Sequence, residues 1–496
     1  MSKYILAMDQ GTTSSRAIVF DHAGDIVALD QKEFKQVFPK PGWVEHDPME
    51  IWNTQKQMAI SAIKKAGIEA SQISSIGITN QRETTVLWDR DTGKPVYNAI
   101  VWQCRRTTGL CEKLKKKGYE KVIRKKTGLL IDPYFSATKI MWMLENVPGL
   151  AKRAKQGEIC FGTIDSWLLF NLTGKHLTEP TNASRTLLFN INTGKWDKEL
   201  LDIFGVPESI LPEVAPTSGC FAMTKKKIFG CEIPVGGIAG DQQASLFGQA
   251  CFKKGDTKNT YGTGCFVLMN TGKKPILSKN KLLTTVAWDL GDGLEYALEG
   301  AVFIGGAVIK WLRDQQKTIA SAADSEEHAR SVADSGGVFF VPAFVGLGAP
   351  YWDPHARGAI FGLTRGTSRA HITRAALESI AFQSYDLIKA QEEDIGHKIK
   401  SLKVDGGASV NSFLMQFQAD VLGIPVVSSA IPETTALGAA YLAGLSCGYW
   451  KSKKDIVDNW HARKTFKPRF DAKKRARRLT GWEHAVAATM KFKPGG

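Results

Sequence analysis

Two similar segments, one at the N-terminus and one near the middle of the chain, constrain the fold most strongly. The first combines predicted strands at Tyr4–Met8 and Ala17–Asp21, and the second combines predicted strands at Thr257–Tyr261 and Cys265–Asn270. The turn inside each segment consists of glycine and small hydroxyl residues, which is typical of a β-hairpin. A hairpin of the same kind at the start of each half predicts a duplicated fold.

The length of the chain agrees with two domains. At 496 residues it is too long for one hydrophobic core. We expect the boundary near Gly248–Gly255, where a predicted helix at Gln242–Phe247 gives way to a basic loop. The expected domains are therefore 1–249 and 250–496. No Pro- or Ser-rich linker separates the two halves, so we expect them to lie close together.

Strand-like and helix-like runs alternate within each half, which is typical of α/β layers around a buried sheet. Besides the hairpins, the predicted strands are Ile73–Ile78, Pro234–Ala239, Leu402–Val404 and Val426–Ser428. The predicted helices are Pro48–Ala66, Ile304–Arg313, Ile372–Gln391, Ser412–Leu422 and Thr434–Leu445. The predicted fold class is α/β.

Composition is that of an ordinary globular protein, with 43% hydrophobic and 23% charged residues. No apolar run is long enough for a membrane span, and the apolar stretch before Asp9 is too short for a secretory signal. The eight cysteines are scattered without a C-x-x-C pair, which indicates neither a zinc site nor disulfides. We therefore expect no integral membrane segment and a reducing, cytoplasmic setting.

The net charge of +16 has two interpretations. It could serve a polyanionic partner such as nucleic acid or a membrane surface, or it could solvate the surface and attract anionic substrates. The densest basic run, Lys473–Arg478, lacks the interleaved aromatic residues of a single-strand binding platform. Because basic residues are spread along the whole chain, we favour the second interpretation and expect no nucleic-acid partner.

Both hairpin turns can hold phosphate groups, because glycine has no Cβ and lets backbone N–H groups approach closely. The second turn is Gly262–Gly264, and the first begins at Gly11, with Arg16 adding a cation on the following strand. The first turn also carries the hydroxyls of Thr12, Thr13 and Ser14. Either turn alone is most simply an ordinary tight turn, but two at the heads of two halves favour a nucleotide site. The chain has no P-loop and no protein-kinase motif, which excludes those folds.

Two further features fit a nucleotide. Asp9 ends the first strand beside its turn, where a carboxylate can hold Mg²⁺ through water, although capping a turn is a common role for such an aspartate. Val404–Ser409 runs from a strand through Gly406-Gly407 into a helix from about Asn411. A helix N-terminus favours the negative charge of a phosphate, but a Gly-Gly pair alone is a weak signal.

In this order, the three elements resemble the phosphate-1, phosphate-2 and adenosine motifs of the actin and sugar-kinase superfamily. Further motifs follow along the chain: DQGTTSSR at Asp9–Arg16, PGWVEHDP at Pro41–Pro48, GITNQRET at Gly77–Thr84, AIVWQCRR at Ala99–Arg106, YFSATKIMW at Tyr134–Trp142, GDQQASLFGQ at Gly240–Gln249 and DGGASVNSFLMQFQAD at Asp405–Asp420. In these motifs the chain resembles the glycerol kinases of the FGGY carbohydrate kinase family, from about residue 4 to residue 485. That resemblance implies two duplicated RNase H-like, actin-like ATPase domains with the active site in the interdomain cleft.

The resemblance implies glycerol as the phosphoryl acceptor. A three-carbon triol needs hydroxyl partners and an apolar wall for its carbons. By resemblance, the residues that line this pocket are Arg82, Glu83, Trp102, Tyr134, Asp241, Gln242 and Phe266. Taken alone, Arg82–Glu83 would be a surface ion pair and Trp102 a core residue. The resemblance also implies that Asp241 is the general base for the attacking hydroxyl, assisted by Asp9 and Arg16.

ATP and Mg²⁺ are the cofactors that the resemblance implies, with Asp9 and Asp241 near the metal. The residues expected against the nucleotide are Thr12, Thr13, Ser14, Arg16, Thr263, Gly306, Lys310, Gly407 and Asn411. Lys310 stands where many family members have glutamine, so ATP use is carried over from the family but the detail of its ribose or adenine contact is not. The family commonly forms dimers or tetramers, so we expect a homo-oligomer.

Two other functions fit part of the pattern. A related kinase for a longer polyol or a ketose would need a roomier pocket than Trp102, Tyr134 and Phe266 are expected to leave. A non-catalytic nucleotide switch of the actin type would give no task to Arg82, Glu83 and Asp241. An acceptor-dependent rise in ATP consumption would separate a kinase from such a switch.

Overall fold

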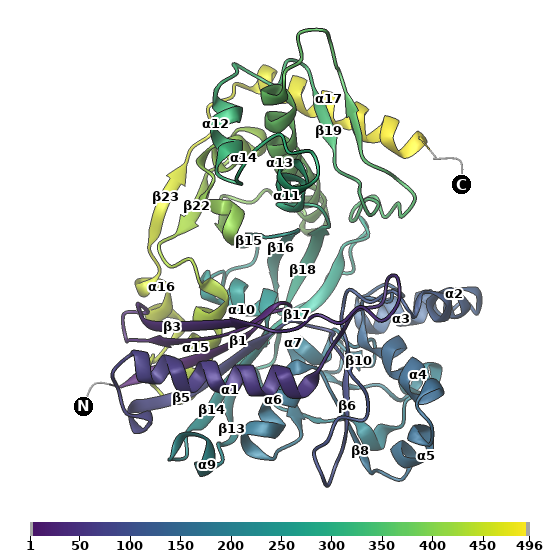
Figure 1. Ribbon diagram of the computed structural model, residues 1–496, viewed down its shortest axis with the longest axis vertical. Helices are drawn as coiled ribbons and strands as arrows, with labels where there is room; N and C mark the ends of the chain where they lie inside the picture. Colours follow the sequence, from purple (N-terminus) through teal and green to yellow (C-terminus); the bar gives the residue numbers. More distant parts are fainter. Residues whose placement is uncertain (1–2, 493–496) are drawn as a thin grey trace.

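The computed structural model describes residues 3–492 and forms two lobes, each around a β-sheet (Figure 1). The lobe drawn lower in Figure 1 contains a six-stranded sheet. Its strands lie in the order β13 (Ser218–Met223), β14 (Pro234–Gly240), β5 (Ile73–Asn80), β1 (Tyr4–Gln10), β2 (Ser14–Phe20) and β3 (Ile26–Glu33). The upper lobe contains a seven-stranded sheet, in the order β17 (Leu283–Asp289), β18 (Leu294–Val302), β16 (Cys265–Gly272), β15 (Thr257–Tyr261), β21 (Leu402–Asp405), β22 (Val426–Ser429) and β23 (Ala462–Phe466).

The two sheets repeat one arrangement of strands. In the first, β1 pairs antiparallel with β2 and parallel with β5. In the second, β15 pairs antiparallel with β16 and parallel with β21. Each lobe thus begins with a hairpin whose first strand also borders a parallel strand, and the predicted pair of hairpins is confirmed.

Three predicted elements were wrong by about three residues or more at a boundary. Strand β2 begins at Ser14 rather than Ala17, because Ser14 already pairs with Glu33 of β3. Helix α11 (Ala307–Asp314) begins later than the predicted Ile304, since the backbone of Gly305 and Gly306 bonds to the turn after β15. Helix α13 (Arg369–Ile395) is longer than predicted at both ends, starting after a capping box at Ser368 and ending at Gly396, whose φ is 78°.

Two helices lie between the sheets and join the lobes. Helix α10 (Asp241–Gly248), from the first half of the chain, contacts β15 and β16 of the second sheet, whereas α15 (Thr434–Ser446), from the second half, packs on β1, β5 and β14. The two helices touch directly, because a Cβ at Gly248 or Gly438 would collide with the backbone of the other helix. Each half therefore supplies a helix to the other, and the boundary between 249 and 250 stays a prediction.

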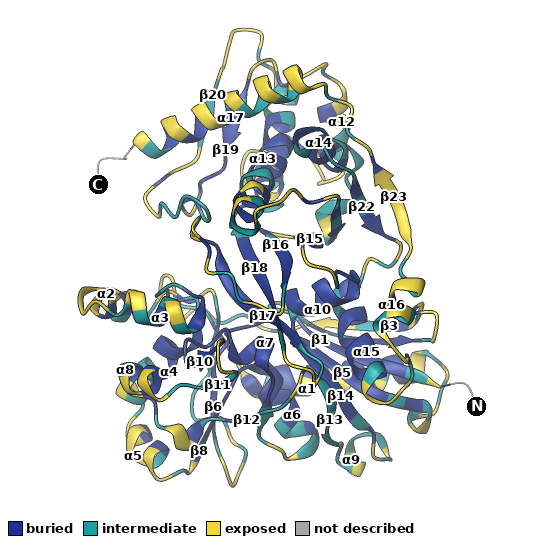
Figure 2. Ribbon diagram, turned by 180° about the vertical axis from the view of Figure 1, so that it is seen from behind, coloured by how far each residue is buried: buried dark blue, intermediate teal, exposed yellow. Residues whose placement is uncertain are grey.

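The outer faces of both sheets are covered by further helices, and the central strands are buried, whereas the edge strands β3, β13 and β23 are largely not (Figure 2). Helices α1 (Pro48–Lys65) and α6 (Ile164–Thr173) contact the first sheet, while α13 and α14 (Ser412–Leu422) contact the second. This layered arrangement agrees with the predicted α/β class. The remaining helices are α2 (Thr108–Lys116), α3 (Glu120–Thr127), α4 (Ser136–Asn146), α5 (Leu150–Lys155), α7 (Pro180–Ala183), α8 (Lys198–Phe204), α9 (Lys226–Phe229), α12 (Asp324–Arg330), α16 (Lys453–Asn459) and α17 (Ala472–Lys491).

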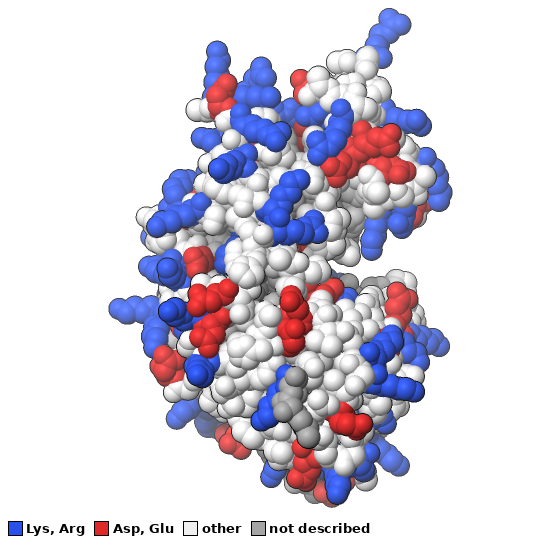
Figure 3. All heavy atoms as spheres, turned by 90° about the vertical axis from the view of Figure 1, so that its left-hand side faces the viewer, with Lys and Arg blue, Asp and Glu red and all other residues white. Residues whose placement is uncertain are grey.

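Short two-stranded pairings complete the structure: β4 (Glu45–His46) with β7 (Ala99–Ile100), β6 (Val86–Asp89) with β8 (Ile159–Gly162), β9 (Leu177–Thr178) with β12 (Glu213–Val214), β10 (Phe189–Asn190) with β11 (Lys195–Trp196), and β19 (Phe339–Val341) with β20 (Ala359–Phe361). Among residues 3–492, no helix is both long and apolar enough to cross a bilayer. Lys and Arg are distributed over both lobes on the face drawn in Figure 3, where the surface is hollowed between the lobes.

Candidate active site

Three strands of the first sheet end at one edge and place the predicted acceptor residues there. Strands β1, β5 and β14 run parallel, so their carboxyl ends meet. Arg82 and Glu83 follow β5, and Asp241 is the first residue of α10, directly after β14. Asp9 lies near the end of β1 and is the register partner of Arg16 on β2.

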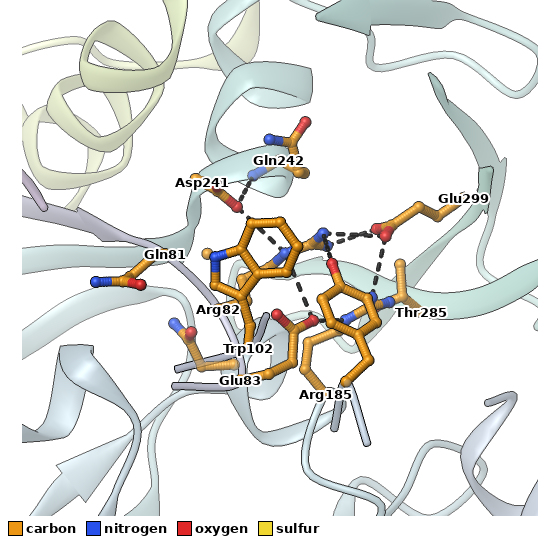
Figure 4. Close-up of polar contacts among 12 residues, drawn as sticks. Gln81, Arg82, Glu83, Trp102, Arg185, Asp241, Gln242, Thr285 and Glu299 are labelled. Carbon is orange, nitrogen blue, oxygen red and sulfur yellow. Dashed lines mark hydrogen bonds and ion pairs between the residues drawn. The ribbon is translucent and has the colours of Figure 1, made fainter. Parts of the chain in front are cut away.

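Arg82 stands at the centre of a buried polar network (Figure 4). Its Nη1 and Nη2 donate to the two carboxylate oxygens of Glu299 on β18, at 2.5 and 3.0 Å. Its Nε lies 3.2 Å from Oδ1 of Asp241, and its Nη2 donates to the hydroxyl of Tyr134 at 3.4 Å. The guanidinium of Arg82 thus orients both Asp241, the predicted base, and the hydroxyl of Tyr134, a predicted acceptor-binding residue. Glu299 on β18 of the other lobe holds this guanidinium in place.

The predicted Arg82–Glu83 pair is looser than expected, with Nε and Oε1 separated by 3.9 Å. Glu83 has a positive φ of 60° and instead accepts from Nε of Arg185 at 2.6 Å. Arg185 also donates through Nη2 to Glu299 at 3.0 Å. Both arginines and both glutamates are buried, so this pocket is an internal network rather than a surface ion pair.

The burial of these charges is balanced by pairing. Burial opposes ionisation of Glu299, but the guanidinium groups of Arg185 and Arg82 prevail and lower its pKa to about 2. Burial raises the pKa of Glu83, although the two arginines act in the opposite direction. Burial also raises the pKa of Tyr134, which therefore stays a neutral hydroxyl. Because each of these buried charges has an oppositely charged partner, Arg82, Arg185, Glu83 and Glu299 hold one another in place.

Aromatic side chains form the wall of the pocket. The rings of Trp102 and Tyr134 meet edge to face, with their centroids 5.5 Å apart. Nε1 of Trp102 donates to Oγ1 of Thr12 at 3.0 Å, which joins the acceptor wall to the first hairpin turn. Phe266, on β16 of the second sheet, is partly buried and packs among the residues between the lobes. Arg82, Trp102, Tyr134 and Asp241 thus lie together, whereas Phe266 packs in the cluster between the two sheets.

Negative charge gathers beside the first hairpin. Burial raises the pKa of Asp9 to about 7; Arg16 opposes this shift, and Glu433 and Asp241 add to it. Glu433, the residue before α15, forms an ion pair with Arg16. Within residues 3–492, no cluster of three or more His, Cys, Asp or Glu is arranged to hold a metal by itself. Asp9 and Asp241 still fit Mg²⁺, which takes one or two protein carboxylates and completes its shell with water and phosphates.

Three glycine-containing turns of the second lobe lie against one another. Backbone N–H groups of Gly305 and Gly306 donate to the carbonyls of Thr263 and Gly262, both at 2.9 Å. A Cβ at Gly306 would lie 2.7 Å from the carbonyl oxygen of Gly262. Gly406 has a φ of 86°, and its Cβ would lie 2.6 Å from the carbonyl oxygen of Tyr261. Only glycine permits this contact between the three turns.

The remaining predicted nucleotide residues border these turns. Thr13, Thr263, Gly407 and Lys310 are exposed, and Thr12, Ser14 and Gly306 are partly buried. Asn411 is the N-cap of α14, where its Oδ1 accepts from the backbone N–H of Leu414 at 2.9 Å. Lys310 lies on α11, directly after the Gly305-Gly306 segment.

Models of two domains match this chain: the FGGY family of carbohydrate kinases, N-terminal domain, at residues 4–248, and the C-terminal domain of the same family at residues 257–447. The chain belongs to the FGGY family of carbohydrate kinases. The family and fold predicted from the sequence are confirmed.

Relatives of this FGGY kinase match it over nearly its full length. A glycerol kinase of Caldanaerobacter subterraneus subsp. tengcongensis is 60% identical over 494 residues, 99% of each chain. Glycerol kinase 2 of Thermotoga maritima is 58% identical over 98% of this chain and 99% of its own. Among solved structures, Plasmodium falciparum glycerol kinase with ADP has a TM-score of 0.93, 38% identity and 98% coverage of both chains.

Sequence reasoning missed four residues of this FGGY kinase site: Arg185, Lys258, Glu299 and Glu433. Arg185 and Glu299 have no local signal, since their partners lie 102 and 217 residues away. Lys258 does have one, because a lysine inside a buried strand directly before a glycine turn is unusual. Its Nζ donates to Oε1 of Gln242 at 2.6 Å.

Proposed function

We infer that this FGGY kinase transfers the γ-phosphoryl group of ATP to glycerol. The observation that carries this function is the 60% identity to a curated glycerol kinase over 99% of both chains. The pocket around Arg82 is consistent with a small triol, since it combines buried donors and acceptors with the aromatic wall of Trp102.

We propose Asp241 as the general base. Its side chain is 33% exposed, and its Oδ1 is held 3.2 Å from Nε of Arg82. The carboxylate accepts the proton of a primary hydroxyl as that oxygen attacks the γ-phosphorus, and the bond to the ADP oxygen breaks. The products are ADP and sn-glycerol 3-phosphate, with the proton on Asp241.

The other acceptor residues bind and orient the triol. Glu83 and Tyr134 offer oxygen partners for hydroxyl groups, and Gln242 offers an amide. Trp102 and Phe266 cover the carbon atoms. Because these groups hold the attacking oxygen beside the phosphate, most of the rate gain comes from positioning and electrostatics.

The phosphates of ATP lie at the two hairpin turns in this proposal. Arg16 leaves its ion pair with Glu433 and binds phosphate oxygen, and the turn at Thr12–Ser14 donates backbone and hydroxyl groups. Asp9 and Asp241 are the residues that would hold Mg²⁺. That ion supplies neutralising charge for the phosphate groups. Thr263, Gly306, Lys310, Gly407 and Asn411 border the nucleotide on the other side.

The test is ADP release with Mg-ATP, compared between glycerol, no acceptor, erythritol, xylulose and gluconate. Turnover that is much faster with glycerol supports the proposal. Faster turnover with a longer acceptor would change the proposed substrate and leave the proposed mechanism unchanged. A rate of ADP release that does not depend on any acceptor would favour the nucleotide switch instead.

We also propose that the enzyme is a cytoplasmic homo-oligomer, a dimer or a tetramer. Light scattering during size-exclusion chromatography measures the mass in solution, and a mass near the 54.4 kDa of one chain would contradict this proposal.

A further inference from the structure

Lys258 is fully buried in β15, between the acceptor residues and the nucleotide turns. Its Nζ donates to Oε1 of Gln242 at 2.6 Å and to Oγ1 of Thr260 at 2.8 Å. Among residues 3–492, no carboxylate lies within ion-pair distance of this ammonium. Burying an ammonium group that has only neutral oxygens as partners lowers the stability of the fold. We therefore ask what the contacts of Lys258 do for the site.

The contact decides which way the amide of Gln242 faces. An ammonium group has three donors and no acceptor, so only the amide oxygen of Gln242 can face it. The amide nitrogen must then point away from Lys258. Within the described part of the chain, Nε2 of Gln242 has no acceptor of its own. Figure 4 shows Gln242 directly after Asp241 at the start of α10, and its backbone N–H donates to Oδ1 of the proposed base at 2.8 Å.

A second contact anchors Lys258 within its own strand, through Thr260. Oγ1 of Thr260 lies 3.4 Å from Oγ of Ser245, which donates to Oδ2 of Asp405 at 2.9 Å. Asp405 ends β21 directly before the Gly406-Gly407 turn. A chain of hydrogen bonds thus runs from the amide of Gln242 to the nucleotide turn of the other lobe.

We propose that Lys258 is a positioning residue that holds the amide of Gln242 so that its NH₂ group donates to a hydroxyl oxygen of the acceptor. This inference rests on the proposed function and adds a determinant of acceptor binding. An amide turned the other way would present an oxygen, which could accept from a hydroxyl but could not donate to one. Lys258 therefore acts on the acceptor and not on the phosphates.

The first test is Lys258→Met, which keeps a long side chain and removes the donor. We expect the KM for glycerol to rise on the order of 10-fold, since one hydrogen bond loses its fixed geometry. The KM for ATP and kcat at saturating glycerol stay close to those of the wild type. Lys403→Met is the matched control: Lys403 is the register partner of Lys258 on β21, but its Nζ donates to the carbonyl of Gln249. This control leaves the KM for glycerol unchanged.

A double-mutant cycle decides whether the effect passes through Gln242. Gln242→Ala should raise the KM for glycerol, and adding Lys258→Met to it should raise that KM no further. Independent, additive effects, or a rise in the KM for ATP, would overturn the inference. If Lys258→Met does not fold, Thr260→Val removes only the second anchor and should raise the KM for glycerol a few-fold, and an unchanged KM would overturn it equally. A wild-type enzyme without glycerol-dependent ADP release would overturn the proposed function and this inference together.

Discussion

The proposed acceptor pocket and the proposed nucleotide turns are built by different means. The pocket is assembled from buried side chains, with Arg82 and Arg185 held between Glu83 and Glu299. The proposed nucleotide turns are assembled from backbone, since a Cβ at Gly306 would collide with Gly262 and a Cβ at Gly406 would collide with Tyr261. One site is defined by paired charges and the other by the absence of a Cβ.

Because of this difference, we expect the two sites to be sensitive to different kinds of substitution. Removing one partner of a buried ion pair leaves an uncompensated charge, so the pocket should respond to changes of charge that preserve shape. A glycine turn contains no charge to lose, so the nucleotide site should respond to an added methyl group. Substitutions in the pocket should therefore change the KM for glycerol, and substitutions in the glycine turns should change the KM for ATP.

The largest effect is expected for Asp241→Asn, which preserves shape and removes the proposed base. Turnover should fall by about 10³-fold, because general-base catalysis typically contributes factors of 10²–10⁴. Binding of ATP, measured by calorimetry, should stay unchanged since the nucleotide turns are untouched. Turnover within a few-fold of the wild type would remove Asp241 from this role.

Glu299→Gln should be the most destabilising of these changes. It leaves Arg82 and Arg185 short of a negative partner in a buried site, which costs about 3–5 kcal/mol of unfolding free energy. The KM for glycerol should rise with it, because Arg82 loses its orientation. Asp292→Asn is the control: it breaks a solvent-exposed pair with Lys273 and should change chemical denaturation little. Equal effects of the two changes would contradict the internal network.

Gly306→Ala addresses the other site. The new Cβ would lie 2.7 Å from the carbonyl oxygen of Gly262, so the two turns must separate. We expect the KM for ATP to rise about 10-fold, the equivalent of about 1.4 kcal/mol, while the KM for glycerol stays unchanged. A change in the KM for glycerol alone would break the proposed division between side-chain and backbone sites.

The smallest effect concerns pH. The folded state lowers the pKa of Glu299 from an ordinary value of 4.5 to about 2, so ionised Glu299 contributes stability above pH 4.5, and this contribution is lost as the pH falls toward 2. The destabilisation caused by Glu299→Gln should therefore shrink when unfolding is measured at pH 5, 4 and 3. A difference between variant and wild type that stays constant over this range would argue against the paired carboxylate.

More of the proposed nucleotide site than of the proposed acceptor pocket could be predicted from the sequence. The second hairpin turn and the Gly406-Gly407 turn are local features, and the structure places these two turns in contact. The residues Arg82 and Asp241 were also found, but as members of motifs. Their partners Arg185 and Glu299 were not, because no spacing along the chain reports a contact over 217 residues.

The sequence by itself determined the pair of hairpins, the glycine turns and the alternation of strands and helices, since each depends on a few neighbouring residues. The tertiary structure alone decided that α10 and α15 each pack on the other half's sheet, and that β18 brings Glu299 to Arg82. Packing of the layers sets those contacts, and it depends on the whole chain at once. Local patterns define the backbone that approaches the phosphates, whereas long-range packing chooses the partners of each buried charge.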